Sequence, residues 1–322
     1  MSQRIGLDLA NGFIKVAHVD GKRLVYENRL TQLTGLEFNA LDSGDDAIVY
    51  EVMGEKYQLS ETGISSGGRN SDRYLTDQYL IECLIALAQV VTERDVVLCL
   101  GLPCRDYLTP GLREQISELL RGSYEVKVNG VPKIINIEHV EVSCEPLGSL
   151  LNTIYDEDLK VIGDRNHYSY LIIDIGFGTT DILGTRDGIK PVKIDYADAG
   201  MMDALNQYLT LINQRMAVEN DKARFKADDV TLKLNPTAKK YGRTYDFHQE
   251  LERAKQYAAK KIESHINQAG VNLNDYDRVL YTGGGSVALR NYLSMPHNAR
   301  VNPRAQLGNA EGYVKYLSLK GV

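Results

Sequence analysis

The segment IIDIGFGTTD, residues 172–181, sets the expectation for the whole chain, because the chain opens on a similar segment, IGLDLANGFIK, at residues 5–15. Each segment is a short apolar run that contains an aspartate, Asp8 or Asp174, near its end and then turns through small residues. Apolar runs of this length bounded by glycine are typical of buried strands. The sequence therefore predicts a strand followed by a tight turn in two separate parts of the chain.

The two segments also agree in spacing. Superposing Asp8 on Asp174 places the two apolar runs and the two turns over each other. An Asp-Gly dipeptide typical of hairpins follows each copy, at Asp20-Gly21 and at Asp187-Gly188, one residue out of step. A single repeat on this scale fits a duplicated domain and not a solenoid.

Composition limits the classes of protein that fit. The chain has 322 residues, of which 43% are hydrophobic, enough to bury two cores. Apolar runs such as 96–100 and 171–175 are strand-sized and too short to span a membrane, and the first residues lack the pattern of a signal peptide. We therefore expect a cytoplasmic protein without a membrane partner.

Charge and cysteine usage exclude two further classes. The formal net charge is -6, with both signs mixed along the chain, which predicts no direct binding of nucleic acid. The basic residues Lys239, Lys240 and Arg243 are interpreted as a solvated loop rather than a DNA contact. The four cysteines show no CxxC pair and lie in or beside apolar segments, so we expect small buried side chains and neither metal ligands nor disulfides.

The pattern of helices and strands suggests how the chain is divided. Apolar residues recur every three or four positions from Asp77 to Glu93, and Thr109-Pro110 and Pro146 are expected to open further helices. The first half is predicted at 1–165, with a small Gly-rich peripheral subdomain at about 35–75. The second half is predicted at 166–322, mostly helical after the hairpin, with a helical subdomain at about 200–268 that includes long helices at 200–217 and 246–268.

The two turns carry residue types that bind phosphate. A carboxylate at a strand end is followed by small residues that let backbone N–H groups approach an anion. A carboxylate would repel a phosphate unless a cation lay between them, so Asp8 and Asp174 suggest a hydrated Mg²⁺ ion, and Lys15 would supply a second positive charge. The alternative is a pair of ordinary hairpins with solvated aspartates. The candidate phosphate-binding residues are Asp8, Asn11, Gly12, Lys15, Gly176, Gly178, Thr179 and Thr180.

A third segment, YTGGGS at residues 281–286, runs from a predicted buried strand into three glycines and then a helix. Glycines at this place leave room for a flat ribose and base, and a helix N-terminus favours the anionic side of a ligand. A flexible turn is the alternative explanation. Gly283, Gly284, Gly285 and Ser286 are the candidate nucleoside-binding residues.

In chain order, IGLDLANGFIK, CEPLGS, IIDIGFGTTD, YTGGGS and NAEGYVKYL resemble the actin, Hsp70 and sugar-kinase superfamily and span nearly the whole chain. Within it, GLPCRDY at 101–107 together with EPLGS is most similar to the ParM-type plasmid-segregation actins. The resemblance implies an actin-like (ribonuclease H-like) α/β fold of duplicated domains around a nucleotide cleft. It also implies that the last helix, at 309–318, crosses back to the first half.

The resemblance also implies roles for single residues. Glu145 would position the attacking water, while Asp174 and Asp8 would hold Mg²⁺ through its water shell. The expected chemistry is slow hydrolysis of ATP, with GTP as the alternative nucleotide. From its chemistry alone, a carboxylate near a terminal phosphate can orient a water for in-line attack, although Glu145 could also be a surface glutamate at a strand end. Ala10 departs from the glycine that is usual in the family.

The resemblance favours a filament that assembles with ATP and disassembles after hydrolysis. A DNA-binding adaptor of the ParR type would then connect the filament to a plasmid centromere, so that the link to DNA is indirect. Two alternatives share the same phosphate-binding turns: a small-molecule kinase, and a non-polymerising nucleotide switch such as an Hsp70-type module. No acceptor-site motif for a kinase is found in the sequence.

Overall fold

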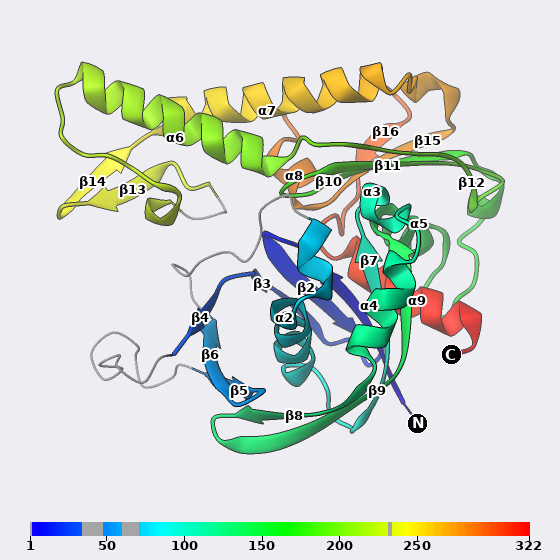
Figure 1. The fold of residues 1–322 in the computed structure, drawn as a ribbon. Helices are drawn as coiled ribbons and strands as arrows, with labels where there is room; N and C mark the ends of the chain where they lie inside the picture. The colour runs from blue at the N-terminus through cyan, green and yellow to red at the C-terminus, as the bar shows by residue number, and fades with distance from the viewer. Residues whose placement is uncertain (1, 34–47, 60–70, 231–233) are drawn as a thin grey trace. The chain divides into compact units, whose positions relative to one another are not determined.

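The computed structural model describes residues 2–33, 48–59, 71–230 and 234–322 (Figure 1). The chain divides into two compact units. Met1–Asn166 and Leu307–Val322 form the first unit, and His167–Gln306 form the second. The last segment of the chain therefore belongs to the same unit as the first.

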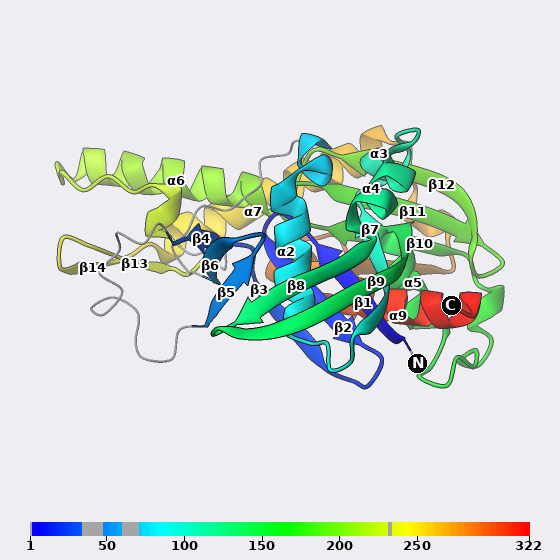
Figure 2. The same ribbon diagram turned by 60° about the horizontal axis from the view of Figure 1, so that its bottom comes forward.

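Within the described residues, the first unit is built on a sheet of nine strands: β1 (Gln3–Leu9), β2 (Phe13–His18), β3 (Arg23–Glu27), β4 (Leu30–Gln32), β5 (Val49–Val52), β6 (Glu55–Leu59), β7 (Asp95–Leu102), β8 (Gly122–Val128) and β9 (Val131–Cys144). Their order across the sheet is β3-β2-β1-β7-β9-β8-β5-β6-β4. β1 is antiparallel to β2 and parallel to β7, and β7 is parallel to β9. Figure 2 shows β8 and β9 as a long curved hairpin, closed by Asn129 and Gly130, which both have positive φ as such turns require.

The helical segments of the first unit are η1 (Ser71–Leu75), α2 (Asp77–Ala88), α3 (Cys104–Tyr107), α4 (Leu112–Leu120), α5 (Glu145–Ile154) and α9 (Gly308–Lys320). Helices α5 and α9 pack backbone against backbone. A Cβ atom on Gly312 would lie 1.8 Å from the Gly148 carbonyl oxygen, so only glycine fits at this crossing. The Ser149 hydroxyl donates to Asn309 Oδ1 at 2.6 Å in the same contact. These contacts attach the C-terminal helix to the first unit.

The second unit repeats the central part of this sheet. Its strands are β10 (Tyr170–Ile175), β11 (Thr180–Arg186), β12 (Lys190–Ala197), β15 (Arg278–Thr282) and β16 (Ala299–Val301), in the order β12-β11-β10-β15-β16. β10 is antiparallel to β11 and parallel to β15, as β1 is to β2 and β7. Strand order and directions therefore match β3-β2-β1-β7-β9, which confirms the duplication that the sequence predicted.

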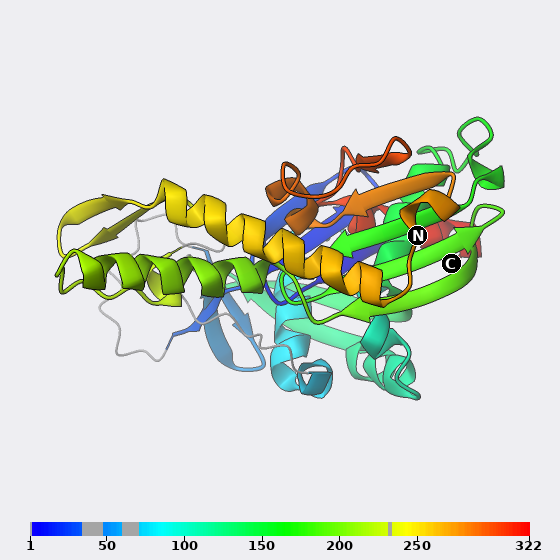
Figure 3. The ribbon, with the colours of Figure 1, turned by 90° about the horizontal axis from the view of Figure 1, so that it is seen from above.

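The remaining elements of the second unit are α6 (Met201–Val218), η3 (Ala227–Asp229), β13 (Thr237–Lys240), β14 (Arg243–Asp246), α7 (His248–Gln268), η4 (Leu273–Asp275) and α8 (Gly284–Ala288), while η2 (Arg165–His167) spans the boundary of the units. Figure 3 shows α6 and α7 side by side, with the β13–β14 hairpin near one end of the pair. A small aromatic core joins them: Tyr208, Phe225, Tyr245 and Phe247 meet at ring-centroid distances of 5.2 to 6.5 Å.

Several sequence predictions are confirmed. The α/β class, the two Asp-Gly hairpins and the long helices of both halves are present. All four cysteines are free and buried. As a separate finding, no helix of the described segments combines the length and the apolar character needed to cross a membrane.

Other predictions need correction. The helix expected from Asp77 to Glu93 ends at Ala88, because Val90 and Val91 bury their side chains in a turn instead. The expected loop of basic residues is the β13–β14 hairpin, in which Lys240 pairs with Asp229 at 2.5 Å. The subdomain predicted at about 35–75 is not among these corrections and stays a prediction, because it lies partly outside the described residues. Its described part contains β5, which pairs with β8 and so continues the main sheet.

Candidate functional site

The first turn joins β1 to β2, and the register of this hairpin sets Asp8 directly across from Lys15. Asp8 is 2% exposed and Lys15 is 9% exposed, and Lys15 Nζ lies 2.8 Å from Asp8 Oδ2. The other carboxylate oxygen, Asp8 Oδ1, is buried and has no hydrogen-bond partner among the described residues. A buried anionic oxygen in this state favours a further cationic or hydrogen-bonding ligand.

Hydrogen bonds from neighbouring elements fix the residues of this turn. Asn28, which follows β3, donates its side-chain amide to the Ala10 carbonyl at 3.1 Å and its backbone N–H to the Gly12 carbonyl at 3.0 Å. The side chain of Asn11 accepts a hydrogen bond from Arg73 of η1. The structure thus brings Asp8, Lys15, Asn11 and Gly12 together, with Asn28 and Arg73 as supports that the sequence analysis did not identify.

The second turn joins β10 to β11 in the second unit. Asp174 is 3% exposed at the end of β10, and Gly176 N donates to the Thr179 carbonyl at 2.9 Å across the turn. The Thr180 hydroxyl donates to the Ala199 carbonyl at 2.8 Å, so it serves the fold. Residues 176–179 are partly exposed, unlike the strands on either side.

The start of α6 anchors this turn. Met201 N donates to the Gly176 carbonyl at 3.2 Å, and Met202 N donates to the Phe177 carbonyl at 2.7 Å. Two of the amides that a helix leaves unsatisfied at its N-terminus are therefore satisfied by the turn. Asp203 accepts from Gly200 N at 2.9 Å and pairs with Lys261 of α7 at 2.7 Å, which fixes the same end of α6.

Asp181 is a residue that the sequence analysis missed. It lies directly across from Asp174 in the β10–β11 register and is fully buried. Its Oδ2 accepts a hydrogen bond from the Thr179 hydroxyl at 3.0 Å. The signal was available in the sequence, because residues paired across an antiparallel hairpin share one face of the sheet and Asp181 pairs with Asp174.

The glycine segment after β15 packs against the end of β10. Gly283 has φ +80°, and a Cβ atom there would lie 2.3 Å from Asp174 Oδ1, while a Cβ atom on Gly285 would meet Ile175 Cγ2 at 2.3 Å. A Cβ atom on Gly284 would have no neighbour within 4 Å in the part of the chain that the structure describes. The Ser286 hydroxyl donates to the Gly283 carbonyl at 2.8 Å. Internal packing thus explains two of the three glycines, and Gly284 alone faces open space.

Glu145 is the first residue of α5 and is partly buried. Burial raises the pKa of Tyr74 above its usual range, and the charges of Asp106 and Glu145 raise it further. Burial likewise raises the pKa of Tyr79, with Arg73 opposing the rise and Glu145 adding to it. Glu145 therefore lies close enough to the η1–α2 segment, which also supports the first turn, for its charge to act there.

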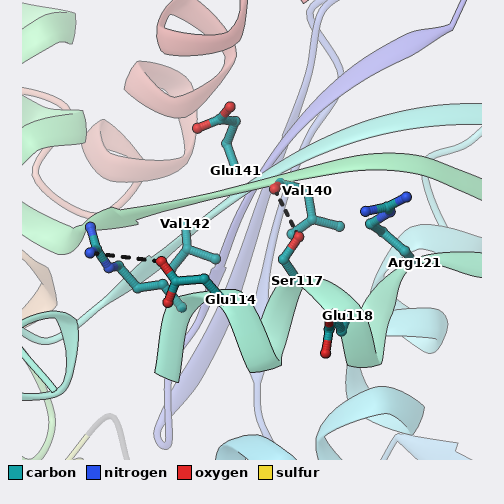
Figure 4. Close-up of a pocket in the computed structure, with 8 residues that line it drawn as sticks. Glu114, Ser117, Glu118, Arg121, Val140, Glu141 and Val142 are labelled. Carbon is teal, nitrogen blue, oxygen red and sulfur yellow. Dashed lines mark hydrogen bonds and ion pairs between the residues drawn. The ribbon is translucent and has the colours of Figure 1, made fainter. Parts of the chain in front are cut away.

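A separate open groove of about 370 Å³ lies between α4 and β9 (Figure 4). Its lining mixes charges of both signs with valines, and the Ser117 hydroxyl donates to the Val140 carbonyl at 3.2 Å. None of the candidate site residues that the sequence predicted lines this groove. Across the described residues, no cluster of three or more His, Cys, Asp or Glu side chains is found that could hold a metal ion directly.

Comparison with protein families matches both units. Residues 6–148 match the family of actin-like proteins, N-terminal domain, and residues 172–295 match the archaeal actin homologue MreB-like, C-terminal, family. No curated protein sequence matches the chain.

Solved structures agree with this assignment. They include the archaeal actin homolog Ta0583 in complex with ADP, at 19% identity and a TM-score of 0.74, over 98% of this chain and 99% of that one. A 15-stranded ParM filament from Clostridium botulinum matches at 16% identity and a TM-score of 0.75, over 99% of both chains. Bacillus thuringiensis ParM with ATP matches at 16% identity and a TM-score of 0.69, over 99% of both chains.

At these identities the solved structures establish the fold, and the two family matches establish the kind of domain in each unit. The duplicated sheets, the paired turns and the two matches agree. The chain is therefore a member of the actin-like proteins, with an actin-like N-terminal domain and an MreB-like C-terminal domain.

Proposed function

We propose that this chain is an actin-like ATPase that binds Mg-ATP, hydrolyses it slowly and assembles with itself into nucleotide-dependent filaments. The observation that carries the proposal is the presence, in each unit, of the same hairpin with a buried aspartate at the end of its first strand, Asp8 or Asp174. Support also comes from the ParM structures named as a filament and as a complex with ATP, and from the Ta0583 complex with ADP.

In this proposal the two turns bind phosphate oxygens. The partly exposed residues 177–179 would supply backbone N–H groups beyond Gly176, whose own N–H donates to Thr179, and the residues around Gly12 would do the same in the first unit. The Lys15 ammonium, 2.8 Å from Asp8, would divide its charge between that carboxylate and a phosphate. Gly284, whose Cα faces open space, would lie against the nucleoside, with Gly283, Gly285 and Ser286 shaping the backbone around it.

The residues fit a hydrated Mg²⁺ ion. Asp8 Oδ1 is a buried carboxylate oxygen that no donor of the described segments contacts, and Asp174 is a buried carboxylate at the corresponding strand end. When bound, the ion supplies positive charge that neutralises the phosphates. Asp8 and Asp174 would hold its water shell, and Glu145, partly exposed at the start of α5, would orient the attacking water.

Hydrolysis removes the contacts that the terminal phosphate makes with the turns, so a filament that requires those contacts would lose stability after hydrolysis. We extend the proposal to plasmid DNA segregation in the cytoplasm, through a DNA-binding adaptor of the ParR type, because structures named ParM are among the matches. GTP remains the alternative nucleotide.

The test is right-angle light scattering of the purified chain after addition of Mg-ATP, with pelleting and phosphate release measured in parallel. A rise in scattering that decays as phosphate appears is the expected result. Binding or hydrolysis without any polymer would overturn the filament proposal and favour a kinase or a nucleotide switch. Repeating the assay with Mg-GTP separates the two nucleotides.

A further inference from the structure

Glu82 is a buried carboxylate on a helix whose other buried residues are mostly apolar. It lies in α2, its side chain is 1% exposed, and its neighbours along the helix include Cys83, Leu84 and Ile85. Burial of a carboxylate costs several kcal/mol unless hydrogen bonds and a cation compensate for it. An apolar residue would fill the same place without that cost, so the contacts that Glu82 makes are informative.

Three side chains compensate the charge. Glu82 Oε2 accepts from Arg73 Nη2 at 2.7 Å and from Asn28 Nδ2 at 3.0 Å, and Oε1 accepts from Gln78 Nε2 at 3.2 Å. The Arg73 side chain is 11% exposed, and its guanidinium lies 5.2 Å from the centre of the Tyr79 ring. The backbone carbonyl of Arg73 accepts a hydrogen bond from the Thr76 hydroxyl at 2.7 Å, which joins η1 to the start of α2. Arg73 is therefore held at both ends.

The Arg73 guanidinium and the Asn28 side-chain amide, which both bind Glu82, come from residues that also contact the first turn. Arg73 Nη1 donates to Asn11 Oδ1, and Asn28 contacts the carbonyls of Ala10 and Gly12. All three residues between β1 and β2 are thus held by groups that share one buried carboxylate. A planar guanidinium can bind a carboxylate and an amide at the same time with a fixed geometry, which a lysine cannot do.

We propose that Arg73 is a positioning residue for the first turn, fixed by Glu82 and acting through Asn11, and that this arrangement holds the turn in the conformation that binds the phosphates of a nucleoside triphosphate. The inference rests on the proposed function for its ligand. Its distinct content is that residues of η1 and α2, remote in sequence from the turn, set the affinity of the turn for ATP.

The test uses the full chain at protein concentrations too low for filaments, with the dissociation constant for radiolabelled ATP and Mg²⁺ measured by equilibrium dialysis. Arg73→Lys keeps the charge but cannot hold both partners, and we expect the dissociation constant to rise about tenfold, the usual effect of losing a charge-assisted hydrogen bond. Glu82→Gln is expected to act in the same direction. Glu114→Gln, whose side chain is 67% exposed on α4, is the matched control and should bind as the wild type does.

A double variant separates positioning from a general structural effect. If Arg73 acts through Asn11, then Arg73→Lys combined with Asn11→Ala should bind ATP no more weakly than Asn11→Ala alone. In the nucleotide-free protein, amide hydrogen exchange of the peptide at residues 8–14 should become faster in Arg73→Lys, while exchange in the second unit stays unchanged. A purely structural role would lower the melting temperature and give additive losses of affinity.

The outcomes distinguish the inference from the proposed function. If the wild type does not bind Mg-ATP, the proposed function fails and this inference fails with it. If the wild type binds and Arg73→Lys binds equally well, or if the losses in the double variant are additive, only the inference is overturned. Faster exchange at residues 8–14 together with non-additive affinities would support it.

Discussion

Lys15 and Asp181 occupy the same position in the two copies of the duplicated hairpin, each directly across from the aspartate at the end of the first strand. In the first unit the pair is Lys15 with Asp8, at 2.8 Å. In the second unit the pair is Asp181 with Asp174, two buried carboxylates on one face of the sheet. The duplication therefore preserved the backbone and changed the charge of the pair.

This difference predicts unequal responses to neutral substitutions. Lys15→Met leaves the Asp8 carboxylate buried without its cation, and we expect the free energy of unfolding to fall by about 3 kcal/mol at neutral pH. Asp181→Asn removes one of two neighbouring like charges and keeps an oxygen that can accept from Thr179, so a change within about 1 kcal/mol is expected. Urea denaturation of the two variants measures both values. Equal losses would contradict this expected difference between the two pairs.

The adjacent glycines Gly283 and Gly284 make a matched pair. Gly283→Ala places a Cβ atom 2.3 Å from Asp174 Oδ1 at a positive φ, and we expect a loss of about 3 kcal/mol in stability. Gly284→Ala meets no atom within 4 Å and should change stability by less than about 1 kcal/mol. If the nucleoside lies against Gly284, the same substitution should still weaken binding of Mg-ATP. Unchanged affinity in a stable Gly284→Ala protein would remove Gly284 from the binding residues.

Glu145→Ala tests the residue proposed to orient the attacking water. We expect Mg-ATP binding to persist and phosphate release to slow by about 100-fold, the usual effect of removing a general base, with longer-lived polymers as the consequence. Phosphate release and the decay of light scattering are measured together. Glu118→Ala, on the exposed side of α4, serves as the control. Unchanged turnover in Glu145→Ala would remove Glu145 from this role.

The ion pair of Asp229 with Lys240 predicts a pH dependence. Burial opposes ionisation of Asp229, but hydrogen bonds from the Lys240 side chain and the Lys226 amide lower its pKa below the usual range. A carboxyl whose pKa is lower in the folded state stabilises the protein above the unfolded pKa of about 3.9, and this contribution is lost as pH falls through the folded value.

Asp229→Asn should therefore cost about 1 kcal/mol at neutral pH, and the difference from the wild type should shrink below about pH 4. Urea denaturation at a series of pH values measures this. Asp187→Asn, which removes an exposed ion pair with Lys190, should show a small difference at every pH. A pH-independent loss in Asp229→Asn would show that packing, not charge, makes the contribution of Asp229.

The sequence predicted the elements whose signals are local. The runs at residues 5–9 and 171–175 became β1 and β10, and the two Asp-Gly turns closed the expected hairpins, because strand periodicity and turn geometry depend on neighbouring residues. The β13–β14 hairpin was missed, since its polar residues lack an apolar alternation and the aromatic contacts of Tyr245 are made with Phe225 and Phe247, outside the hairpin.

The sequence by itself determined the duplication, the two acidic turns and the strand that leads into the three glycines, because each depends on residues that are adjacent in the sequence. Only the tertiary structure decided which distant residues meet: Arg73 with Asn11, Glu82 with Asn28, and Gly148 with Gly312. These contacts join positions 54 or more residues apart, and no local pattern in a single sequence specifies them. Packing of helices on a common sheet brings such groups together, and burial then makes their pairing obligatory.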